Sequence, residues 1–333
     1  GVINHSATSI IGDDIDRIIR KAKIRTKTVE IESSGFTGSY AFGYKSAVIR
    51  ILRAITKKGL QKKPKSVNIL GLSILNYNWE NDVAELKRVL ALLGIRVISV
   101  ICAGESLKNI ERAGQAQLNL VVNEEYGDTV AAFLEKEYGI PSIGPPIGAP
   151  YGLTNSERWF KAVADKLKLS SQSVALESKR VRMKCYPALS RATSTANNIR
   201  GSSFAIFGDS SQVVSLVIFL YQYLGMYPSA IGLREICAQS IRTLKSFLSD
   251  NSLDCQVLFS PDQYEIVDAL NQYNPSLVLG SGIEEHLCPM LKEPVSFIPI
   301  SFPYYEKIQL TMRPLVGFNG VLTIVEEIIN SFN

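Results

Sequence analysis

The most constraining feature of this sequence is a series of short apolar segments that alternate with segments of helical periodicity. The clearest apolar segments are "SVNILGLS" (66–73), "IRVISVIC" (95–102), "LNLVV" (118–122), "SSFAIFG" (202–208), "CQVLFS" (255–260) and "PSLVLGS" (275–281). Strands that are apolar at nearly every position are buried on both faces, and this requires parallel sheets covered by helices. The sequence therefore predicts an α/β protein built from repeated, doubly wound parallel sheets.

Helices are predicted between these strands, because apolar residues recur there at helical spacing. The segments 80–94, 127–139 and 209–225 each end on a glycine, as is typical just beyond a helix C-terminus. The stretch 150–201 is predicted to be mostly helical. Thr154 or Asn155 is expected to cap a helix over 154–169, and a long basic helix over 173–197 is expected to break at Pro187.

The order of elements occurs twice, which indicates an internal repeat. "ALLGIRVISV" is similar to "QYLGMYPSAIG", and "AQLNLVV … YGIPSIGPPIG" to "NPSLVLGS … KEPVSFIPISFP". We therefore expect a second domain over 63–150, a helical connection over 151–200 and a third domain with a C-terminal helix over 201–333. Residues 1–62 are expected to be the remainder of a first domain, since "GVINHSA" is typical of the end of a buried strand.

Composition excludes several classes of protein. Hydrophobic residues make up 46% of the 333 residues and the net charge is +5, so the chain can bury large cores. The basic runs "RIIRKAKIRTK" and "KKGLQKKPK" carry no interleaved aromatic residues, which favours a solvated or partner-facing surface over nucleic-acid binding. There is no apolar run of membrane-spanning length. The five cysteines are scattered, which argues against a disulfide framework and for the reducing cytoplasm.

Few residues carry an evident catalytic signal. Asp209 and Ser210 stand at a predicted helix start, as N-cap residues or as ligand contacts, and "GSGIEE" (280–285) is expected to form a turn with acids in a first helical turn. The chain has two histidines, His5 and His286, which makes a histidine-dependent catalytic triad a weak candidate. Cys102 and Cys288 are expected to be buried structural thiols.

The segment "NHSATSIIGDDID" (4–16) looks at first like a metal-binding carboxylate pair. Apolar residues at helical spacing follow it, which predicts a helix with Gly12 or Asp13 at its N-cap and Asp14 and Asp16 in its first turn. Acids at these positions accept hydrogen bonds from unpaired amides and offset the helix dipole. This accounts for the carboxylates without a metal.

Several motifs together resemble the nitrogenase component 1 family. They are "SATSIIGDDID", "SSGFTGSYAFGYKSAVIRIL" (33–52), "LEKEYGIP" (134–141) and "FPYYEKIQLTMRPLVGFNGVLTIVEEIINSF" (302–332). The resemblance covers the whole chain in order, and it implies Rossmann-like domains of the nitrogenase component 1 type. That family includes molybdenum–iron protein subunits, cofactor-assembly scaffolds, dark-operative protochlorophyllide reductase and the F430 reductive cyclase.

The resemblance also implies the chemistry and the partners. Family members carry out multi-electron reductions with iron–sulfur clusters held by cysteine thiolates, in dimers or tetramers of homologous subunits, with electrons from an ATP-hydrolysing iron protein. Four positions match family ligand or cavity sites. They are Ser6, where a cysteine is expected, Gly35 and Ser39 in the "GFTGSY" loop, and Asn123, where cofactor-carrying subunits have a cysteine.

These departures leave the cluster in question. Segment 299–303 lacks the histidine that holds the large molybdenum-type cofactor, so we do not expect that cofactor here. Ser6 is expected to line a cavity, with iron ligation as the alternative. The first hypothesis is a nitrogenase-like oxidoreductase subunit. The alternatives are a non-catalytic scaffold or assembly protein for a metallocluster or tetrapyrrole precursor, and, on fold analogy alone, a sugar-nucleotide or small-molecule binder.

Overall fold

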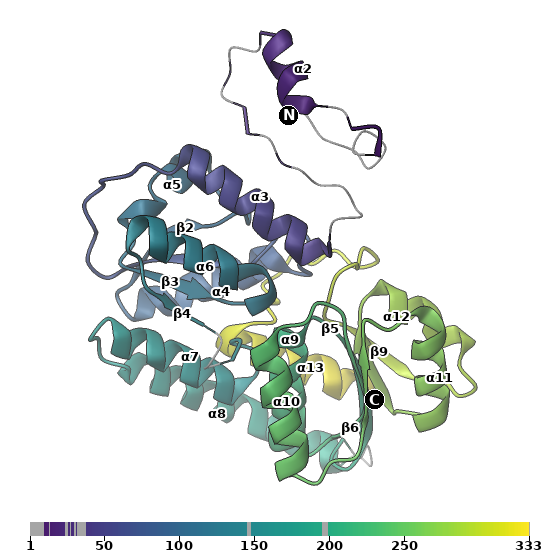
Figure 1. Ribbon diagram of the computed structural model, residues 1–333. Helices are drawn as coiled ribbons and strands as arrows, with labels where there is room; N and C mark the ends of the chain where they lie inside the picture. Colours follow the sequence, from purple (N-terminus) through teal and green to yellow (C-terminus); the bar gives the residue numbers. More distant parts are fainter. Residues whose placement is uncertain are drawn as a thin grey trace.

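Two parallel sheets with helices on both faces organise the chain (Figure 1). The structure is a computed structural model that describes residues 10–12, 14–23, 26, 28–29, 31, 38–144, 148–194 and 199–332. The expected strand near the N-terminus, together with His5, Ser6 and Gly35, lies outside these described residues. The α/β class with doubly wound parallel sheets is confirmed.

The first sheet has the strand order β2-β1-β3-β4, and every neighbouring pair is parallel. Its strands are β1 (Ser66–Leu70), β2 (Arg96–Val100), β3 (Leu118–Val121) and β4 (Ser142–Ile143). Its helices are α3 (Tyr40–Ile55), α4 (Trp79–Leu92), α5 (Leu107–Glu111) and α6 (Glu124–Tyr138), with a 3-10 turn at Ala113–Gln115. Leu70 and Val121 pack against α3, α5 and α6, whereas Ile69 and Leu120 face α4, because successive strand side chains point to opposite faces.

The second sheet has the order β7-β6-β5-β8-β9 and is also fully parallel. Its strands are β5 (Ser203–Gly208), β6 (Tyr227–Leu233), β7 (Gln256–Phe259), β8 (Leu277–Gly280) and β9 (Ser296–Pro299). Its helices are α9 (Ser210–Phe219), α10 (Ala238–Asp250), α11 (Gln263–Tyr273) and α12 (Gly282–Leu287), with a π-helical turn at Leu220–Leu224 and a 3-10 turn at Cys288–Met290. Phe204 and Ile206 pack towards α9 and α10, and Ala205 and Phe207 towards α11 and α12.

The two sheets place the repeated motifs at equivalent positions. The central strands β1 and β5 are each flanked on one side by the following strand, β2 or β6, and on the other by β3 or β8. The second sheet adds β7 outside β6, with α10 and α11 before and after it. The strands of the first sheet fall within the range 63–150 and those of the second within 201–333. The division of the whole chain into domains remains a prediction.

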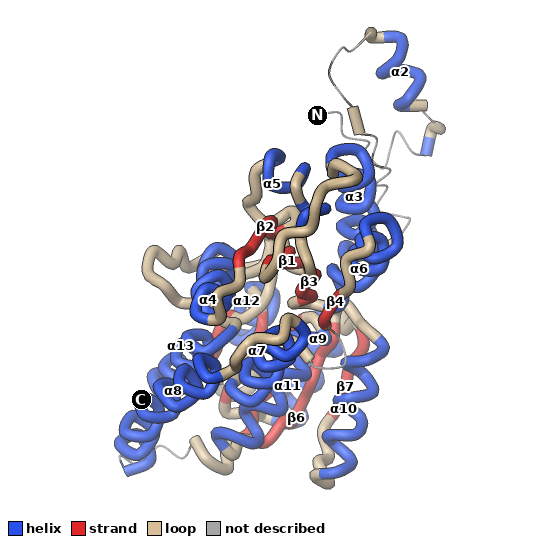
Figure 2. Tube along the Cα trace, turned by 90° about the vertical axis from the view of Figure 1, so that its left-hand side faces the viewer, coloured by secondary structure: helices blue, strands red, loops and turns tan. Residues whose placement is uncertain are grey.

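Three helices connect the two sheets. They are α7 (Leu153–Lys166), α8 (Gln172–Ser194) and α13 (Gly317–Ser331), which lie beside one another in Figure 2. Phe160 of α7 stacks on Phe318 of α13 with ring centroids 5.8 Å apart, and both rings are fully buried. Because α13 also contacts α4 and β9, it joins the first sheet to the second.

The closing motif "RPLVGFNG" is fixed by two buried acids of α4. The amides of Leu315 and Val316 donate to Asp82 Oδ1 at 2.6 and 3.2 Å, and the Asn319 amide donates to Glu85 Oε1 at 3.0 Å. These carboxylates satisfy amides at and just before the N-terminus of α13, where a helix favours negative charge. The motif is therefore the joint between the C-terminal helix and the first sheet.

The cap of the first described helix differs from the prediction by one or two residues. Helix α2 (Ile15–Lys21) has Asp14 at its N-cap, and the Arg17 amide donates to Asp14 Oδ1 at 2.8 Å. Gly12 has φ +72 and lies before the helix. The carboxylate is a helix cap, as the sequence indicated, but it is Asp14 and not Gly12 or Asp13 that caps.

The expected cap of α7 is wrong. The N-cap is Gly152, with no side-chain cap, and Thr154 and Asn155 lie inside the first turn. Gly152 has φ +74, and a Cβ there would lie 2.5 Å from Phe219 Cβ. Only glycine allows the chain both to turn here and to pack this closely against α9. This tertiary contact therefore determines where the helix begins.

The expected break in the long basic helix is wrong, since α8 runs unbroken through Pro187. Proline in a helix interior removes one backbone hydrogen bond and destabilises the helix by about 3 kcal/mol. Packing of α8 against both α7 and α13 offsets this loss.

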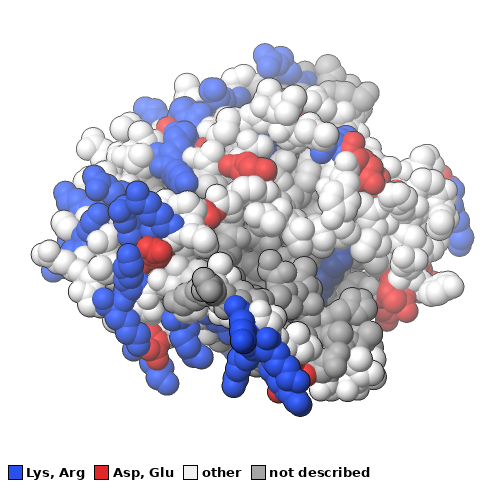
Figure 3. Space-filling model, turned by 90° about the horizontal axis from the view of Figure 1, so that it is seen from above, with Lys and Arg blue, Asp and Glu red and all other residues white. Residues whose placement is uncertain are grey.

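The lysine-rich connection between α3 and β1 holds the first sheet together. Figure 3 shows that Lys and Arg side chains gather on part of the face seen from above, with few acidic side chains among them. Lys57 pairs with Glu111 at 3.0 Å and Lys58 with Glu137 at 2.8 Å. Lys62 Nζ donates to the carbonyls of Gly114 and Tyr138 at 3.0 and 2.9 Å.

Among the described helices, none is both long and apolar enough to cross a membrane.

Candidate functional site

Residues that follow the carboxyl ends of strands in both sheets line one small cavity, and we call this place the cleft. In doubly wound proteins, ligands bind beyond the strand ends at the point where neighbouring strands diverge. Here the divergence points lie between β1 and β3 and between β5 and β8. Side chains from both halves enclose a cavity of about 10 Å³, with room for about one water molecule. The side chains that line it include Tyr77, Asp82, Asn123, Tyr151, Asp209 and Phe302.

Asn123 ties two loops of the first sheet together. It follows β3 and is 3% exposed. Its Nδ2 donates to the Gly71 carbonyl at 3.0 Å, and the Tyr151 hydroxyl donates to its Oδ1 at 3.2 Å. Gly71 has φ +83, and a Cβ there would lie 2.4 Å from the Asn123 carbonyl oxygen, so this close approach needs glycine. Both ends of the amide are engaged in protein hydrogen bonds.

Tyr126 and Asp209 join the two halves across the cleft. The Tyr126 hydroxyl on α6 donates to Asp209 Oδ2, at the end of β5, over 2.7 Å. Burial raises the pKa of Asp209, and the neighbouring Glu235 carboxylate raises it further. Burial and Asp209 together raise the pKa of Tyr126 above its ordinary value. Asp209 therefore keeps its proton at a higher pH than an exposed aspartate does.

Glu125 provides a second link between the halves. Its Oε1 accepts hydrogen bonds from the Ser210 hydroxyl and the Ser211 amide, both at 2.5 Å. Burial, and then the charge of Asp209, raises the pKa of Glu125 to about 7. Among the described residues, no partner reaches its Oε2. Asp209 occupies the N-cap position of α9 as expected, but Glu125 from the other half accepts the hydrogen bonds of a cap.

Asp82 is the third buried carboxyl at the cleft. Burial raises its pKa to about 7, against the lowering effect of the Leu315 and Val316 amides that it accepts. Burial thus raises the pKa of three carboxyls where the two sheets meet, namely Asp82 and Asp209, which line the cavity, and Glu125.

Ser39 lies at the rim of the cleft and caps α3. Its Oγ accepts the Phe42 amide at 3.4 Å and donates to Glu235 Oε2 at 2.8 Å. The Ala41 amide donates to the other Glu235 oxygen at 3.1 Å, so the carboxylate holds the N-terminus of α3 against the second sheet. Tyr40 then stacks on Phe302 at 6.3 Å between centroids. Ser39 therefore has a structural role in positioning the aromatic rim.

The described side chains do not fit an iron–sulfur cluster. Of the two described residues among the four predicted positions, Asn123 is engaged at both ends and Ser39 is a helix cap. Within the described ranges, no three His, Cys, Asp or Glu side chains are grouped as metal ligands. Burial raises the pKa of Cys102 to about 11 and also raises that of Cys288 to about 11, so neither is a thiolate at neutral pH. Both thiols are partly buried, less than expected.

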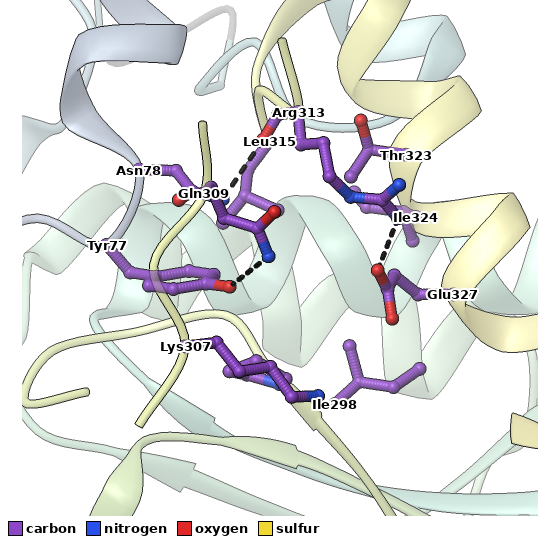
Figure 4. A pocket seen from close by; sticks show the side chains of 11 residues that line it. Tyr77, Asn78, Ile298, Lys307, Gln309, Arg313, Leu315, Thr323, Ile324 and Glu327 are labelled. Atoms are coloured by element: carbon purple, nitrogen blue, oxygen red, sulfur yellow. Dashed lines mark hydrogen bonds and ion pairs between the residues drawn. The ribbon is translucent and has the colours of Figure 1, made fainter. Parts of the chain in front are cut away.

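A small neighbouring cavity of about 20 Å³ is closed by polar contacts (Figure 4). Tyr77 lines both this cavity and the cleft. Gln309 Nε2 donates to the Tyr77 hydroxyl at 3.4 Å, and Arg313 pairs with Glu327 and, at 3.3 Å, with Glu326. The two acids of α13 compensate the Arg313 cation and fix this end of segment 307–313 to α13, whereas Lys307, which also lines the cavity, has no ion pair among the described residues.

Sequence reasoning missed Asp82, Glu125 and Tyr126. Each acid lies in the first turn of a helix, where a carboxylate is expected simply to offset the dipole. Their partners come from segments 85 to 234 positions away along the chain. Asp209 was identified as a cap with ligand contact as the alternative, and it does line the cleft.

The fold and the cleft together define an α/β protein with two parallel sheets whose strand ends share one polar, acid-lined cleft. The family model described as "Nitrogenase component 1 type Oxidoreductase" matches residues 1–333, and this chain belongs to that family. The resemblance inferred from the sequence is thereby confirmed.

Relatives and solved structures agree with this assignment. The chain is 25% identical to one of the subunits of the light-independent protochlorophyllide reductase of Acaryochloris marina and 26% identical to the same subunit of Trichormus variabilis, over 98% of this chain and 65% of each relative. It therefore spans about 65% of the length of these relatives. The structure "Nitrogenase Cp1 at pH 6.5" shares the fold with a TM-score of 0.82 and 17% identity, over 98% of this chain and 74% of that chain.

Proposed function

We propose that this chain is a subunit of a nitrogenase component 1 type reductase, and that its cleft supplies protons to a reducible substrate. In this proposal the complex performs an iron–sulfur-dependent multi-electron reduction, with electrons from an ATP-dependent iron protein. The observation that carries the proposal is the Tyr126–Asp209 pair at the joint carboxyl ends of two parallel sheets. Membership of an oxidoreductase family supports redox chemistry at that place.

The proton chemistry follows from the buried carboxyls. Reduction of a double bond adds electrons and protons in equal number, so a reductase needs acids that hold protons near neutral pH. Burial raises the pKa of Asp209 above its ordinary value, and we propose Asp209 as such an acid. After Asp209 gives up its proton, the Tyr126 hydroxyl, at 2.7 Å, stabilises the carboxylate that remains. Asp209 is the proposed proton donor, and Tyr126 positions it.

The relatives suggest the class of substrate. Their name states that they reduce protochlorophyllide, and we propose a conjugated ring compound of that kind for this chain. The aromatic rim of Tyr40, Phe302 and Tyr305 supports this, since Phe302 lies 6.3 Å from each of the other two rings. Flat conjugated rings stack favourably on such side chains.

A homologous subunit is the proposed partner. The segment between the cleft and the closing motif exposes large apolar side chains, with Tyr305 at 73%, Ile308 at 85% and Leu310 at 94%. Ile74, at 58%, exposes a further apolar side chain just after the first strand. Contiguous exposed apolar side chains mark interaction surfaces. Burial of these exposed apolar side chains against a second subunit would also enclose the cleft.

We propose no reaction step through a cluster in the described side chains, because they do not fit one. Cluster ligands in this proposal come from the partner or from residues outside the described ranges, which include Ser6 and Gly35. The predictions for these two positions stand as predictions. A second candidate is the non-catalytic scaffold or assembly protein. It is favoured by Asn123, which stands where the family resemblance implies a cysteine and whose side-chain amide makes two hydrogen bonds within the protein.

The test is turnover of the assembled complex. The chain is produced without oxygen together with its homologous subunit and the iron protein, and ATP-dependent reduction of protochlorophyllide is followed by absorbance. The proposal expects turnover that requires this chain and ATP. A complex that retains iron or bound tetrapyrrole but shows no ATP-dependent turnover would support the scaffold function instead. Electron paramagnetic resonance of Ser6→Ala in the same complex tests whether Ser6 holds the cluster.

A further inference from the structure

A larger cavity lies on the other side of Tyr151 from the cleft. It is bounded by α7, α8 and α9, and we call it the α7–α9 cavity. Its volume is about 250 Å³, against about 10 Å³ for the cavity at the cleft. Tyr151 lines both this cavity and the cleft, so the two are separate spaces that share one wall.

The N-terminus of α7 opens into this cavity. Gly152, Leu153 and Thr154 all line it, and the N-cap Gly152 has no side chain to accept the amides of the first turn. The amides of Leu153, Thr154 and Asn155 make no hydrogen bond to any residue that the structure describes. Unpaired amides at the start of a helix of 14 residues, with the helix dipole, favour an anion.

Asn155 independently indicates a ligand at the same place. This side chain is 7% exposed and lines the cavity. Within the described part of the chain, its amide group has no hydrogen-bond partner, although the Asn123 amide at the cleft has two. A buried polar group without a partner destabilises a protein by about 1–3 kcal/mol unless water or a ligand satisfies it. Asn155 therefore offers a donor and an acceptor to whatever occupies the cavity.

Arg182 brings a cation to the opposite wall. Its guanidinium pairs with Glu157 at 3.2 Å and with the Ser178 hydroxyl at 3.4 Å. A guanidinium has five N–H donors, so this pairing leaves donors for a ligand. Arg182 lines the cavity, and Glu157, which is not among its lining residues, also contacts Ser178. A ligand therefore meets free N–H donors of an arginine whose charge is shared with Glu157.

The remaining wall combines two polar side chains, Ser215 and Gln222, with apolar and aromatic ones. Ile218 and Phe219 belong to the last turn of α9, and Tyr223 belongs to the π-helical turn that follows. Phe219 and Tyr223 stack at 5.3 Å between centroids. Single π-helical turns occur often at functional sites. The cavity thus has an end rich in N–H donors at α7 and α8 and an aromatic side at α9.

We propose that the α7–α9 cavity is a binding site for a small organic carboxylate. The carboxylate lies between the first amides of α7, Asn155 and Arg182, and its apolar body lies against Phe219. This site is distinct from the cleft and does not depend on the proposed reductase function.

The test uses isothermal titration calorimetry on the full chain at pH 7 and fixed ionic strength, with benzoate, succinate and inorganic phosphate as probes. Benzoate is expected to bind saturably at one site, and phosphate more weakly. Asn155→Leu and Arg182→Gln each remove one contact and are expected to weaken benzoate binding at least ten-fold. Arg180→Gln is the matched control, because Arg180 is on the same helix but bonds to Glu177 and Asn319.

A second measurement stands independently of the variants. In crystals soaked with 4-bromobenzoate, the anomalous bromine peak is expected between α7 and α9. The proposal is overturned if none of the probes binds, if phosphate binds more tightly than benzoate, or if both variants bind like the control. A bromine peak confined to other places would overturn it as well, even if Asn155→Leu failed to fold.

Discussion

Replacement of Asp82 by asparagine tests whether a buried cleft carboxyl favours its protonated form. Asp82 is 1% exposed, and its Oδ1 accepts the amides of Leu315 and Val316. Asparagine has the same shape and keeps an oxygen for both amides, so Asp82→Asn removes the ionisation and little else. The change is therefore expected to alter how stability depends on pH more than it alters stability at acidic pH.

The magnitude follows from the raised pKa. Burial moves the pKa of Asp82 from 3.8 to about 7, so the folded state binds this proton more tightly than the unfolded state does. The stability contributed by the proton is fully present below the unfolded pKa and is lost as the pH rises through about 7. Between the two pKa values, each pH unit lowers the free energy of unfolding by about 1.4 kcal/mol, which gives a loss of about 3 kcal/mol between pH 5 and pH 8.

Urea unfolding at pH 5, 6, 7 and 8 measures this difference. Relative to the wild type, Asp82→Asn is expected to gain about 3 kcal/mol in free energy of unfolding from pH 5 to pH 8. Asp250→Asn, at an exposed position at the end of α10, is the control and should run parallel to the wild type. A constant difference between Asp82→Asn and the wild type at all four pH values would refute the argument.

Two further predictions concern the rim and the close approach at the cleft. Gly71→Ala is expected to lower the free energy of unfolding by about 3 kcal/mol or more, because its Cβ meets the Asn123 carbonyl. Gly94→Ala, at φ +70 with open space around it, should lose about 1–2 kcal/mol, and thermal unfolding of both variants checks the contrast. Ser39→Ala removes a helix cap and is expected to lower the free energy of unfolding by about 1 kcal/mol, with no change in the iron content of the complex. A loss of iron in this variant would instead show that Ser39 is a metal ligand.

The sheets could be predicted because burial on both faces gives the central strands a largely apolar sequence, although the edge strand β7 is only partly buried. The pattern at β1, "SVNIL", is fully buried, and so is that at β8, "LVLG". The glycines after α4 and α6 also marked the helix ends, since Gly94 and Gly139 have positive φ. These are local signals, and they do not depend on which segments meet in space.

The cleft was harder to predict, because its contacts join segments far apart in sequence. Glu125 acts on α9 through Ser210 and Ser211, and nothing in "NEEYGD" identifies that partner. Likewise, the start of α7 at Gly152 depends on its packing against Phe219. The resemblance identified the family correctly, but it could not say which side chains of this chain surround the cleft.

The most direct test of the account is the turnover of a complex that carries Asp209→Asn. The variant keeps a hydrogen-bond acceptor for Tyr126 but holds no transferable carboxyl proton. We expect unchanged assembly with the homologous subunit and an ATP-dependent turnover at least ten-fold below that of the wild type, while Asp250→Asn retains full turnover. Wild-type turnover from an assembled Asp209→Asn complex would contradict the account.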